Sequence, residues 1–260
     1  IVTPTGLVLT TVIQGVDLAN PNGNGTGKVN VTITAAHAIT YKIDFGDGTA
    51  AQMVPSGVII YKYGAPGTNN YTITVNAIGT AGVMSTISKQ IKVFVNFQIP
   101  VDILLNLTNN SSKVWQTDHD AMGHFGVGPN TEFSPIWYAA TPNTREACAY
   151  DDDITLRMLI DNKGASFSIG AAAAFYGFAG GDGCYPVNTG GNRSLIFMDA
   201  TSNSTPAQST RIQFTVPGNG IINFGTGGTT YEILSLTATQ INLRNIGIDG
   251  NSWYQKLIKK

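Results

Sequence analysis

Charged residues are scarce in this chain, and their signs nearly cancel, with 15 Lys and Arg against 16 Asp and Glu. Nucleic acids and anionic membranes are bound by strongly basic surfaces, so the charge favours neither partner. Long apolar runs are also missing. The longest, residues 169–179, is too short and too rich in Gly and Ala to cross a bilayer. We therefore expect no nucleic-acid partner, no membrane span and a neutral ligand.

Cysteine is rare as well. Cys148 and Cys184 are the only two, and their spacing matches neither a CxxC pair nor a metal site. We favour one structural disulfide over two free thiols, which indicates an exported protein. The sequence begins at Ile1 with no signal-like segment, so we expect any leader to have been removed, and a lipid anchor before Ile1 would not be visible.

Patterns typical of catalysis are missing too. There is no G-x-S-x-G, and the three histidines include a pair, His119 and His124, whose spacing is not specific for metal. We expect no catalytic residue and no metal-dependent chemistry. The alternative is a glycoside hydrolase that uses Glu146 or Glu232 together with an Asp.

What the chain does contain is β-forming sequence. Thirty glycines and few helix formers accompany alternating stretches such as Val29, Val31 and Ile33. Six strands are expected before residue 97, at 7–15, 28–36, 40–47, 58–63, 71–77 and 85–95. Their spacing predicts a small sandwich.

Two motifs in this region carry a resemblance. Residues 41–49 read YKIDFGDGT, and residues 63–75 read YGAPGTNNYTITV. Both resemble the signature motifs of the PKD (polycystic kidney disease) repeat, although Ile43 stands where a Trp is common. The resemblance implies an immunoglobulin-like spacer domain over residues 1–97, of the kind found in extracellular multidomain proteins.

Residues 98–260 form a second periodic region. Strands are expected at 154–160, 166–172, 194–198, 211–216, 221–224, 231–236, 241–246 and 253–258. The segment Thr237–Gln240 is expected to be the turn of a hairpin. Because no run shows sustained helical periodicity, we expect a larger antiparallel β-sandwich, jelly-roll-like, of eight or nine strands.

The stretch from Trp115 to Asp153 is rich in aromatic and loop-forming residues. Proteins bind sugars by stacking aromatic rings on the apolar faces of the sugar and by hydrogen-bonding its hydroxyl groups. We expect a rigid binding loop here, with Trp137 and Tyr138 as candidate platforms. The alternative for Trp137 is a loop anchor packed on the sandwich. Trp115 is a further candidate, although its place on an expected strand is also typical of core. Trp253 is expected to be core.

A second glycine-rich loop spans residues 176–192. A bridge between Cys148 and Cys184 would place this loop beside the first, adding the aromatic candidates Tyr150, Tyr176 and Tyr185. Polar candidates for the sugar hydroxyls are Arg145, Glu146, Asp182 and Asn188. The alternative is two unrelated loops, each folded over its own aromatics.

The acidic run Asp151–Asp153 opens an expected strand. Acids there often cap turns, and they can also provide oxygen ligands for calcium. No cofactor is required, and a structural calcium near Asp151 and Asp152 is the alternative.

The phrases GHFGVGP, SPIWY and YDDDITL, with WYQKL near the C-terminus, resemble surface lipoproteins of Bacteroidota polysaccharide-utilisation systems. Tyr138 stands where those chains often have a second Trp. The resemblance implies a non-catalytic glycan-binding protein that is lipid-anchored at the outer membrane, and we expect a monomer. It also implies a β-glucan such as laminarin as ligand and a glycan importer as partner. An adhesin module that binds protein is a further alternative.

Overall fold

The computed structural model describes residues 1–160, 164–169, 173–175, 183–186, 191–218 and 220–260. The chain divides into two compact units, Ile1–Phe97 and Gln98–Lys260, each with its own sheets. Paired strands in both units are antiparallel, and the predicted all-β class is confirmed. Three predicted site residues, Tyr176, Asp182 and Asn188, lie outside the described residues.

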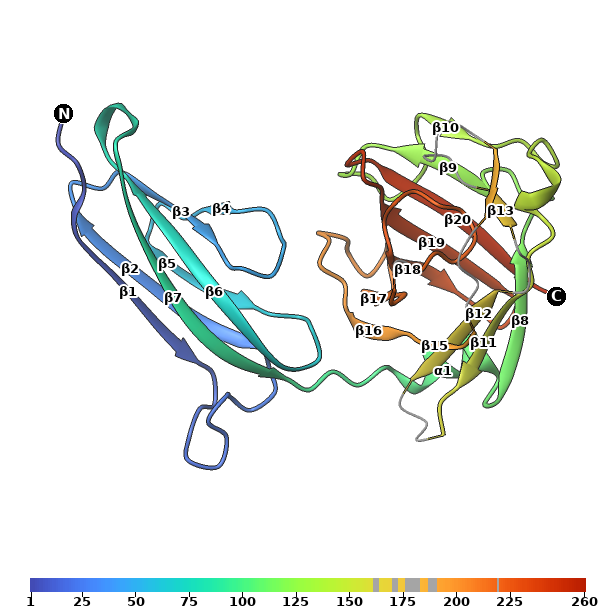
Figure 1. Cartoon of the computed structure of the whole chain (residues 1–260), viewed down its shortest axis with the longest axis horizontal. Coiled ribbons are helices and arrows are strands. Elements are labelled where there is room, and N and C mark those ends of the chain that lie inside the picture. The colour runs from blue at the N-terminus through green and yellow to red at the C-terminus, as the bar shows by residue number, and fades with distance from the viewer. Residues whose placement is uncertain (161–163, 170–172, 176–182, 187–190, 219) are drawn as a thin grey trace. The chain divides into compact units, whose positions relative to one another are not determined.

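The first unit is a sandwich of a three-stranded sheet, β1-β2-β5, and a four-stranded sheet, β4-β3-β6-β7 (Figure 1). All six predicted strands are present, and a short β4 is added. The bounds are β1 Thr5–Ile13, β2 Lys28–Ala36, β3 Thr40–Asp44, β4 Gln52–Met53, β5 Val58–Lys62, β6 Gly67–Ile78 and β7 Met84–Val95, with a 3-10 turn at Thr80–Gly82. Alternate residues face the core, as the period of two requires.

Aromatic rings fill one part of this core. Phe45 stacks on Tyr61 with ring centroids 3.5 Å apart, and Tyr63 stacks on Tyr71 at 3.9 Å. The Tyr63 hydroxyl donates to the Phe45 carbonyl at 2.9 Å. The Tyr61 hydroxyl donates to Asp47 Oδ2 at 2.6 Å. The aspartate of the predicted glycine turn therefore also ties that turn to the neighbouring sheet.

The second unit is built on an 11-stranded sheet, within the part of the chain that the structure describes. Its main path is β15-β12-β11-β8-β20-β19-β18-β17-β16, and β9 and β10 branch from β20 (Figure 1). The bounds are α1 Val101–Thr108, β8 Ser112–Thr117, β9 Phe125–Gly128, β10 Tyr138–Ala139, β11 Ile154–Met158, β12 Ala165–Ile169, β13 Ala173–Phe175, β14 Cys184–Pro186, β15 Arg193–Ser194, β16 Ile196–Asp199, β17 Ile212–Thr215, β18 Thr230–Leu236, β19 Gln240–Ile246 and β20 Ser252–Lys259, with a 3-10 turn at Ala147–Ala149.

Three sequence predictions for this unit are wrong. No helix was expected, but residues 101–108 form helix α1. Its buried side chains Ile103, Leu104 and Leu107 pack against the sheet. Its pattern is too short to show a helical period. Residues 221–224 are a loop rather than a strand. The segment 115–153 is not one irregular loop, because β8, β9 and β10 run through it.

No helix among the described residues has the length and apolar character needed to span a membrane.

Candidate functional site

A row of three side chains crosses strands β10, β9 and β20. Val127 lies opposite Tyr138 on one side and opposite Trp253 on the other. Residues directly opposite one another in antiparallel strands project from the same face of the sheet. Phe125, two residues before Val127, therefore joins the same face.

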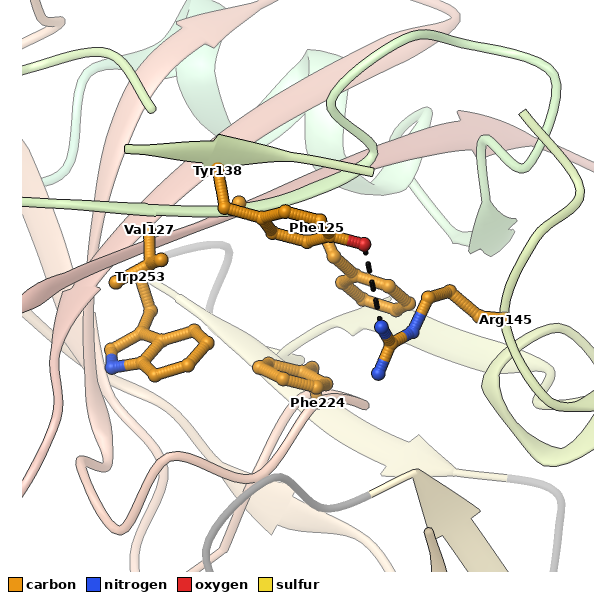
Figure 2. A pocket seen from close by; sticks show the side chains of 7 residues that line it. Phe125, Val127, Tyr138, Arg145, Phe224 and Trp253 are labelled. Carbon is orange, nitrogen blue, oxygen red and sulfur yellow. Dashed lines mark hydrogen bonds between the residues drawn. The ribbon is translucent and has the colours of Figure 1, made fainter. Parts of the chain in front are cut away.

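These side chains line a pocket of about 220 Å³ (Figure 2). Phe224, from the loop that precedes β18, stacks on Phe125 at 4.7 Å and lies 5.4 Å from the Trp253 ring. Arg145 closes another side, and its guanidinium Nη1 donates to the Tyr138 hydroxyl at 3.4 Å. The full lining is Phe125, Gly126, Val127, Tyr138, Arg145, Phe224 and Trp253.

The segment 129–137 passes over the opposite face of β9. Gly126 is required there because a Cβ at this position would come within 2.4 Å of Pro135 Cβ and 2.8 Å of the Tyr138 carbonyl. Trp137 closes the segment by donating its backbone N–H to the Val127 carbonyl at 3.1 Å. The loop that carries the two predicted platforms is therefore fixed to the sheet.

Two side chains of the sheet hold the base of this loop. Arg244 donates to the carbonyls of Asn130 at 2.5 Å and Glu132 at 3.0 Å. The Tyr254 hydroxyl donates to the same Glu132 carbonyl at 2.7 Å. Arg244 also lies 4.7 Å from the Phe133 ring centroid, within the range of a cation–π contact.

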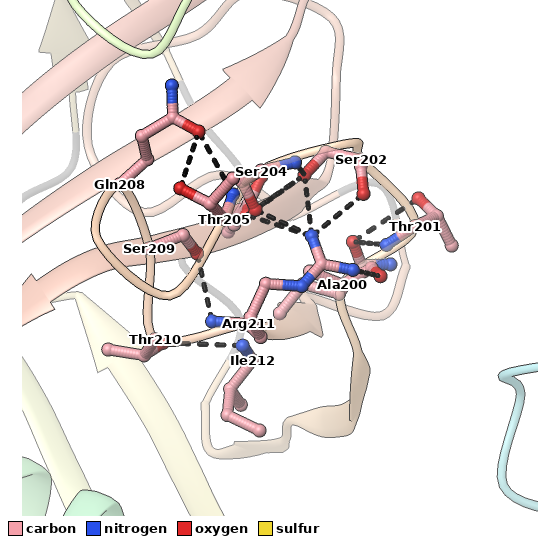
Figure 3. A network of polar contacts seen from close by, with 12 residues as sticks. Ala200, Thr201, Ser202, Ser204, Thr205, Gln208, Ser209, Thr210, Arg211 and Ile212 are labelled. Carbon is pink, nitrogen blue, oxygen red and sulfur yellow. Dashed lines mark hydrogen bonds and ion pairs between the residues drawn. The ribbon is translucent and has the colours of Figure 1, made fainter.

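A buried carboxylate balances Arg244. Glu232, which is 4% exposed, lies 3.4 Å from Arg244 Nη1 and 4.0 Å from Arg211 Nη1. It also accepts hydrogen bonds from Ser204 and Ser202. Figure 3 shows how Arg211 ties down the loop between β16 and β17 through Ser202, Ser204 and the Ala200 carbonyl. Two arginines and two serine hydroxyl groups therefore hold the Glu232 carboxylate in place, and its role as a hydrolytic carboxylate stays a prediction.

The predicted site residues separate into different environments. Trp137 is 60% exposed and Tyr138 is 45% exposed. Tyr138 and Arg145 line the pocket, whereas Trp137 does not. Glu146 is exposed and lies 3.8 Å from Arg145 Nε. The binding roles of all four residues stay predictions.

The prediction that Trp115 belongs to the site is wrong. Its ring is fully buried, and its indole N–H donates to the Leu107 carbonyl of α1 at 3.1 Å. Trp115 therefore anchors the helix on β8, which is the core role that its strand position allowed.

The predicted bridge between Cys148 and Cys184 is present. It joins the turn beside Arg145 to β14, which carries Tyr185. Tyr150 and Tyr185 are both half-buried and lie outside the pocket lining. The Tyr150 hydroxyl instead contacts His124 Nε2 and the Arg145 backbone N–H, each at 2.9 Å, and so connects two parts of the segment that precedes it.

The three carboxylates of the acidic run lie in different environments. Asp153 pairs with Lys260 at 2.6 Å, while Asp152 is 1% exposed and neither of its oxygens has a hydrogen-bond partner. Burial, with Asp151 and Asp153 nearby, raises the pKa of Asp152 to about 7. Among the described residues no group of three or more His, Cys, Asp or Glu is placed to hold a metal. These carboxylates alone do not provide the six to eight oxygen ligands that calcium takes, and calcium stays a prediction.

Sequence reasoning missed Phe125, Val127 and Phe224 as pocket residues and assigned Trp253 to the core. Alternation within FGVG could have placed Phe125 and Val127 on one face. Nothing local to the sequence could have paired Val127 with Trp253, because that contact depends on the register of β9 and β20.

Comparison with known proteins gives weak likenesses. No family model matches the chain. No curated protein matches it. Among solved structures, the PKD1 domain of Vibrio anguillarum Epp is 16% identical, with a TM-score of 0.25, over 36% of this chain and 99% of that one. A carbohydrate-binding module of the β-sandwich superfamily, from a study of promiscuous specificity, is 11% identical, with a TM-score of 0.28, over 99% of this chain and 92% of that one.

Proposed function

We propose that the second unit is a non-catalytic carbohydrate-binding domain whose site is the pocket between β9, β10 and β20. The observation that carries the proposal is the row of Tyr138, Val127 and Trp253, open to solvent at Tyr138 and backed by Phe125 and Phe224. Aromatic rings beside a few polar groups match the alternation of C–H faces and hydroxyl groups on a sugar.

The size of the pocket limits what enters it. Its volume of about 220 Å³ is below the ~300 Å³ at which typical small-molecule sites begin. We expect it to take one sugar ring, with the rest of a polysaccharide outside. The Arg145 guanidinium and the Tyr138 hydroxyl lie at the rim, where they can hydrogen-bond sugar hydroxyl groups.

The finer assignment is a neutral polysaccharide, with a β-glucan such as laminarin as the first ligand to test. It is supported by the pairing of Arg145, the charged residue of the described lining, with Glu146 at 3.8 Å, by the low charge of the chain and by the lipoprotein-like motifs. The same motifs support a lipid-anchored position at the outer membrane, beside a glycan importer, with the first unit as a spacer. The expected affinity is of micromolar to millimolar order, typical of shallow, wet sites.

The test is affinity electrophoresis of the full chain against a panel of soluble glycans, followed by titration calorimetry on any that retard it. Tyr138→Ala should weaken binding about tenfold, since it removes a ring and a hydroxyl group from the pocket. The matched control is Ile136→Ala, in the same loop and 59% exposed but outside the lining, which should bind within about twofold of wild type.

Two results would contradict the proposal. One is that no neutral glycan of the panel retards the wild-type chain. The other is that Tyr138→Ala binds as wild type while Ile136→Ala does not. Release of reducing sugar by the wild-type chain that disappears in Glu146→Ala would establish a glycosidase instead.

A further inference from the structure

Arg145 lines the pocket, but its backbone is held by a residue outside it. The Arg145 backbone N–H donates to the Tyr150 hydroxyl oxygen at 2.9 Å. That hydroxyl lies 2.9 Å from Nε2 of His124, a fully buried side chain directly before β9. Tyr150 therefore connects the wall of the pocket to a buried imidazole.

The direction of each of these hydrogen bonds follows from the Ala121 carbonyl, the last group in the series. His124 Nδ1 lies 2.8 Å from the Ala121 carbonyl, and because a carbonyl only accepts, Nδ1 must carry a proton. In the neutral ring Nε2 is then an acceptor, so the Tyr150 hydroxyl donates to it. The Tyr150 oxygen remains an acceptor for the Arg145 N–H, and each group in this series of hydrogen bonds has a partner.

Protonation of His124 would reverse the direction of the hydrogen bond between its Nε2 and the Tyr150 hydroxyl. With a proton on Nε2, the imidazolium donates to the Tyr150 oxygen, which then faces two donors while its own hydrogen loses its acceptor. An unsatisfied polar group at a half-buried position is costly. The Arg145 backbone N–H must then share the Tyr150 oxygen with the imidazolium, which weakens the contact that holds Arg145.

The surroundings favour the neutral ring. Burial lowers the pKa of His124 below its ordinary value of 6.5, and electrostatic interactions with His119 and Arg145 act in the same direction. The Ala121 hydrogen bond and the Asp118 carboxylate oppose this shift. Asp120 is also nearby in the chain, but it is exposed and bonds Asn143.

We propose that His124, acting through Tyr150, is a positioning residue for Arg145 and holds this wall of the pocket only while its imidazole is neutral. Acidification should then make Arg145 more mobile and lower the affinity for the ligand. The binding part of this inference rests on the proposed function, whereas the positioning part does not.

The positioning part is tested on the ligand-free full chain by nuclear magnetic resonance. At pH 7.5, His124 should be neutral with its proton on Nδ1, and the Arg145 amide should be protected from hydrogen exchange. Tyr150→Phe keeps the ring but removes the hydroxyl, and it should lower the Arg145 protection at least about tenfold. The matched control is His119→Gln, which removes the neighbouring imidazole and should leave Arg145 protected. A proton on Nε2, or unchanged protection of Arg145 in Tyr150→Phe, would overturn the inference.

The binding part is tested by laminarin calorimetry between pH 5 and 8. Wild-type affinity should be constant above pH 6.5 and fall below the His124 pKa by up to about tenfold per pH unit, the slope for one proton. His124→Gln cannot titrate there, so its profile should be flat. The series is extended to lower pH until nuclear magnetic resonance shows that His124 is protonated, and an affinity that stays constant through that titration would overturn the coupling. If laminarin does not bind at pH 7.5, the proposed function fails for this ligand, and the Arg145 exchange experiment alone decides whether His124 is a positioning residue.

Discussion

Each unit gathers aromatic rings at one place, and the two clusters differ in what covers them. In the first unit, Tyr63 is fully buried and Phe45, its hydrogen-bond acceptor, is also fully buried. In the second unit, Phe125 and Phe224 are buried, but Tyr138 is 45% exposed and Trp253 is only half-buried. Rings covered by protein stabilise the fold, whereas rings left in water at a pocket are available to a ligand.

The polar groups beside the rings differ in the same way. Asp47 in the first unit accepts hydrogen bonds from Tyr61 and Thr49. At the pocket, Tyr138 and Arg145 contact each other at 3.4 Å, a long hydrogen bond that, under the proposed function, a sugar hydroxyl would replace or share. The comparison teaches that similar residue types form either a core or a site, depending on whether the sheet register brings a cover over them.

The largest expected effect concerns the aromatic cluster of the first unit around Tyr63. Tyr63→Ala should lower the free energy of unfolding of the first unit by about 4 kcal/mol, because it removes a buried ring and the hydroxyl that bonds Phe45. Denaturant unfolding of the full chain, followed by tyrosine fluorescence and circular dichroism, measures it. A loss below about 1 kcal/mol would show that this cluster is not closed as described.

The next effect concerns Asp152, a buried carboxyl of the second unit that lacks the partners Asp47 has. Its folded pKa, about 7, is above the unfolded value of 3.8, so the folded state holds its proton more tightly. The native state therefore loses stability as pH rises from about 4 to 7, and the cost is complete above 7. Asp152→Asn removes this cost and should raise the free energy of unfolding at pH 8 by up to about 4 kcal/mol, with little gain at pH 4.

Denaturant unfolding at both pH values measures this change, and a gain of the same size at pH 4 and pH 8 would refute the titration argument. The same variant tests calcium. If the ion binds at Asp152, added CaCl2 should stabilise the wild-type chain at pH 8 but not Asp152→Asn.

Local patterns predicted most of the framework. Alternation in KVNVTITAA predicted β2 with the right residues buried, whereas the strand predicted at 40–47 ends at Asp44, before the GDG turn. The bridge between Cys148 and Cys184 was also anticipated, and the structure decides between the two alternatives for Trp137 in favour of an exposed ring. Short elements were missed where tertiary packing decides the structure, as in α1, which depends on burial of Leu104 and Leu107.

The pocket itself could be predicted only in part. Tyr138 and Arg145 belong to the stretch that the sequence singled out, and both line it. Phe224 and Trp253 come from segments about 100 residues further along, and only the register of β20 on β9 brings Trp253 to Val127. Pairing between distant strands is set by the whole sheet and leaves no local signal.

The smallest expected effect separates two neighbours in one loop. Trp137 is more exposed than Tyr138 but does not line the pocket, so its ring can meet only the part of a polysaccharide that lies outside. Trp137→Ala should weaken laminarin binding about two- to threefold, less than Tyr138→Ala, and should leave the unfolding midpoint unchanged, because little buried area is lost. Calorimetry of both variants under one condition measures the ratio. A greater loss from Trp137→Ala would move the main sugar contact from the pocket to the exposed indole, and retained binding of a protein partner without any glycan affinity would favour an adhesin.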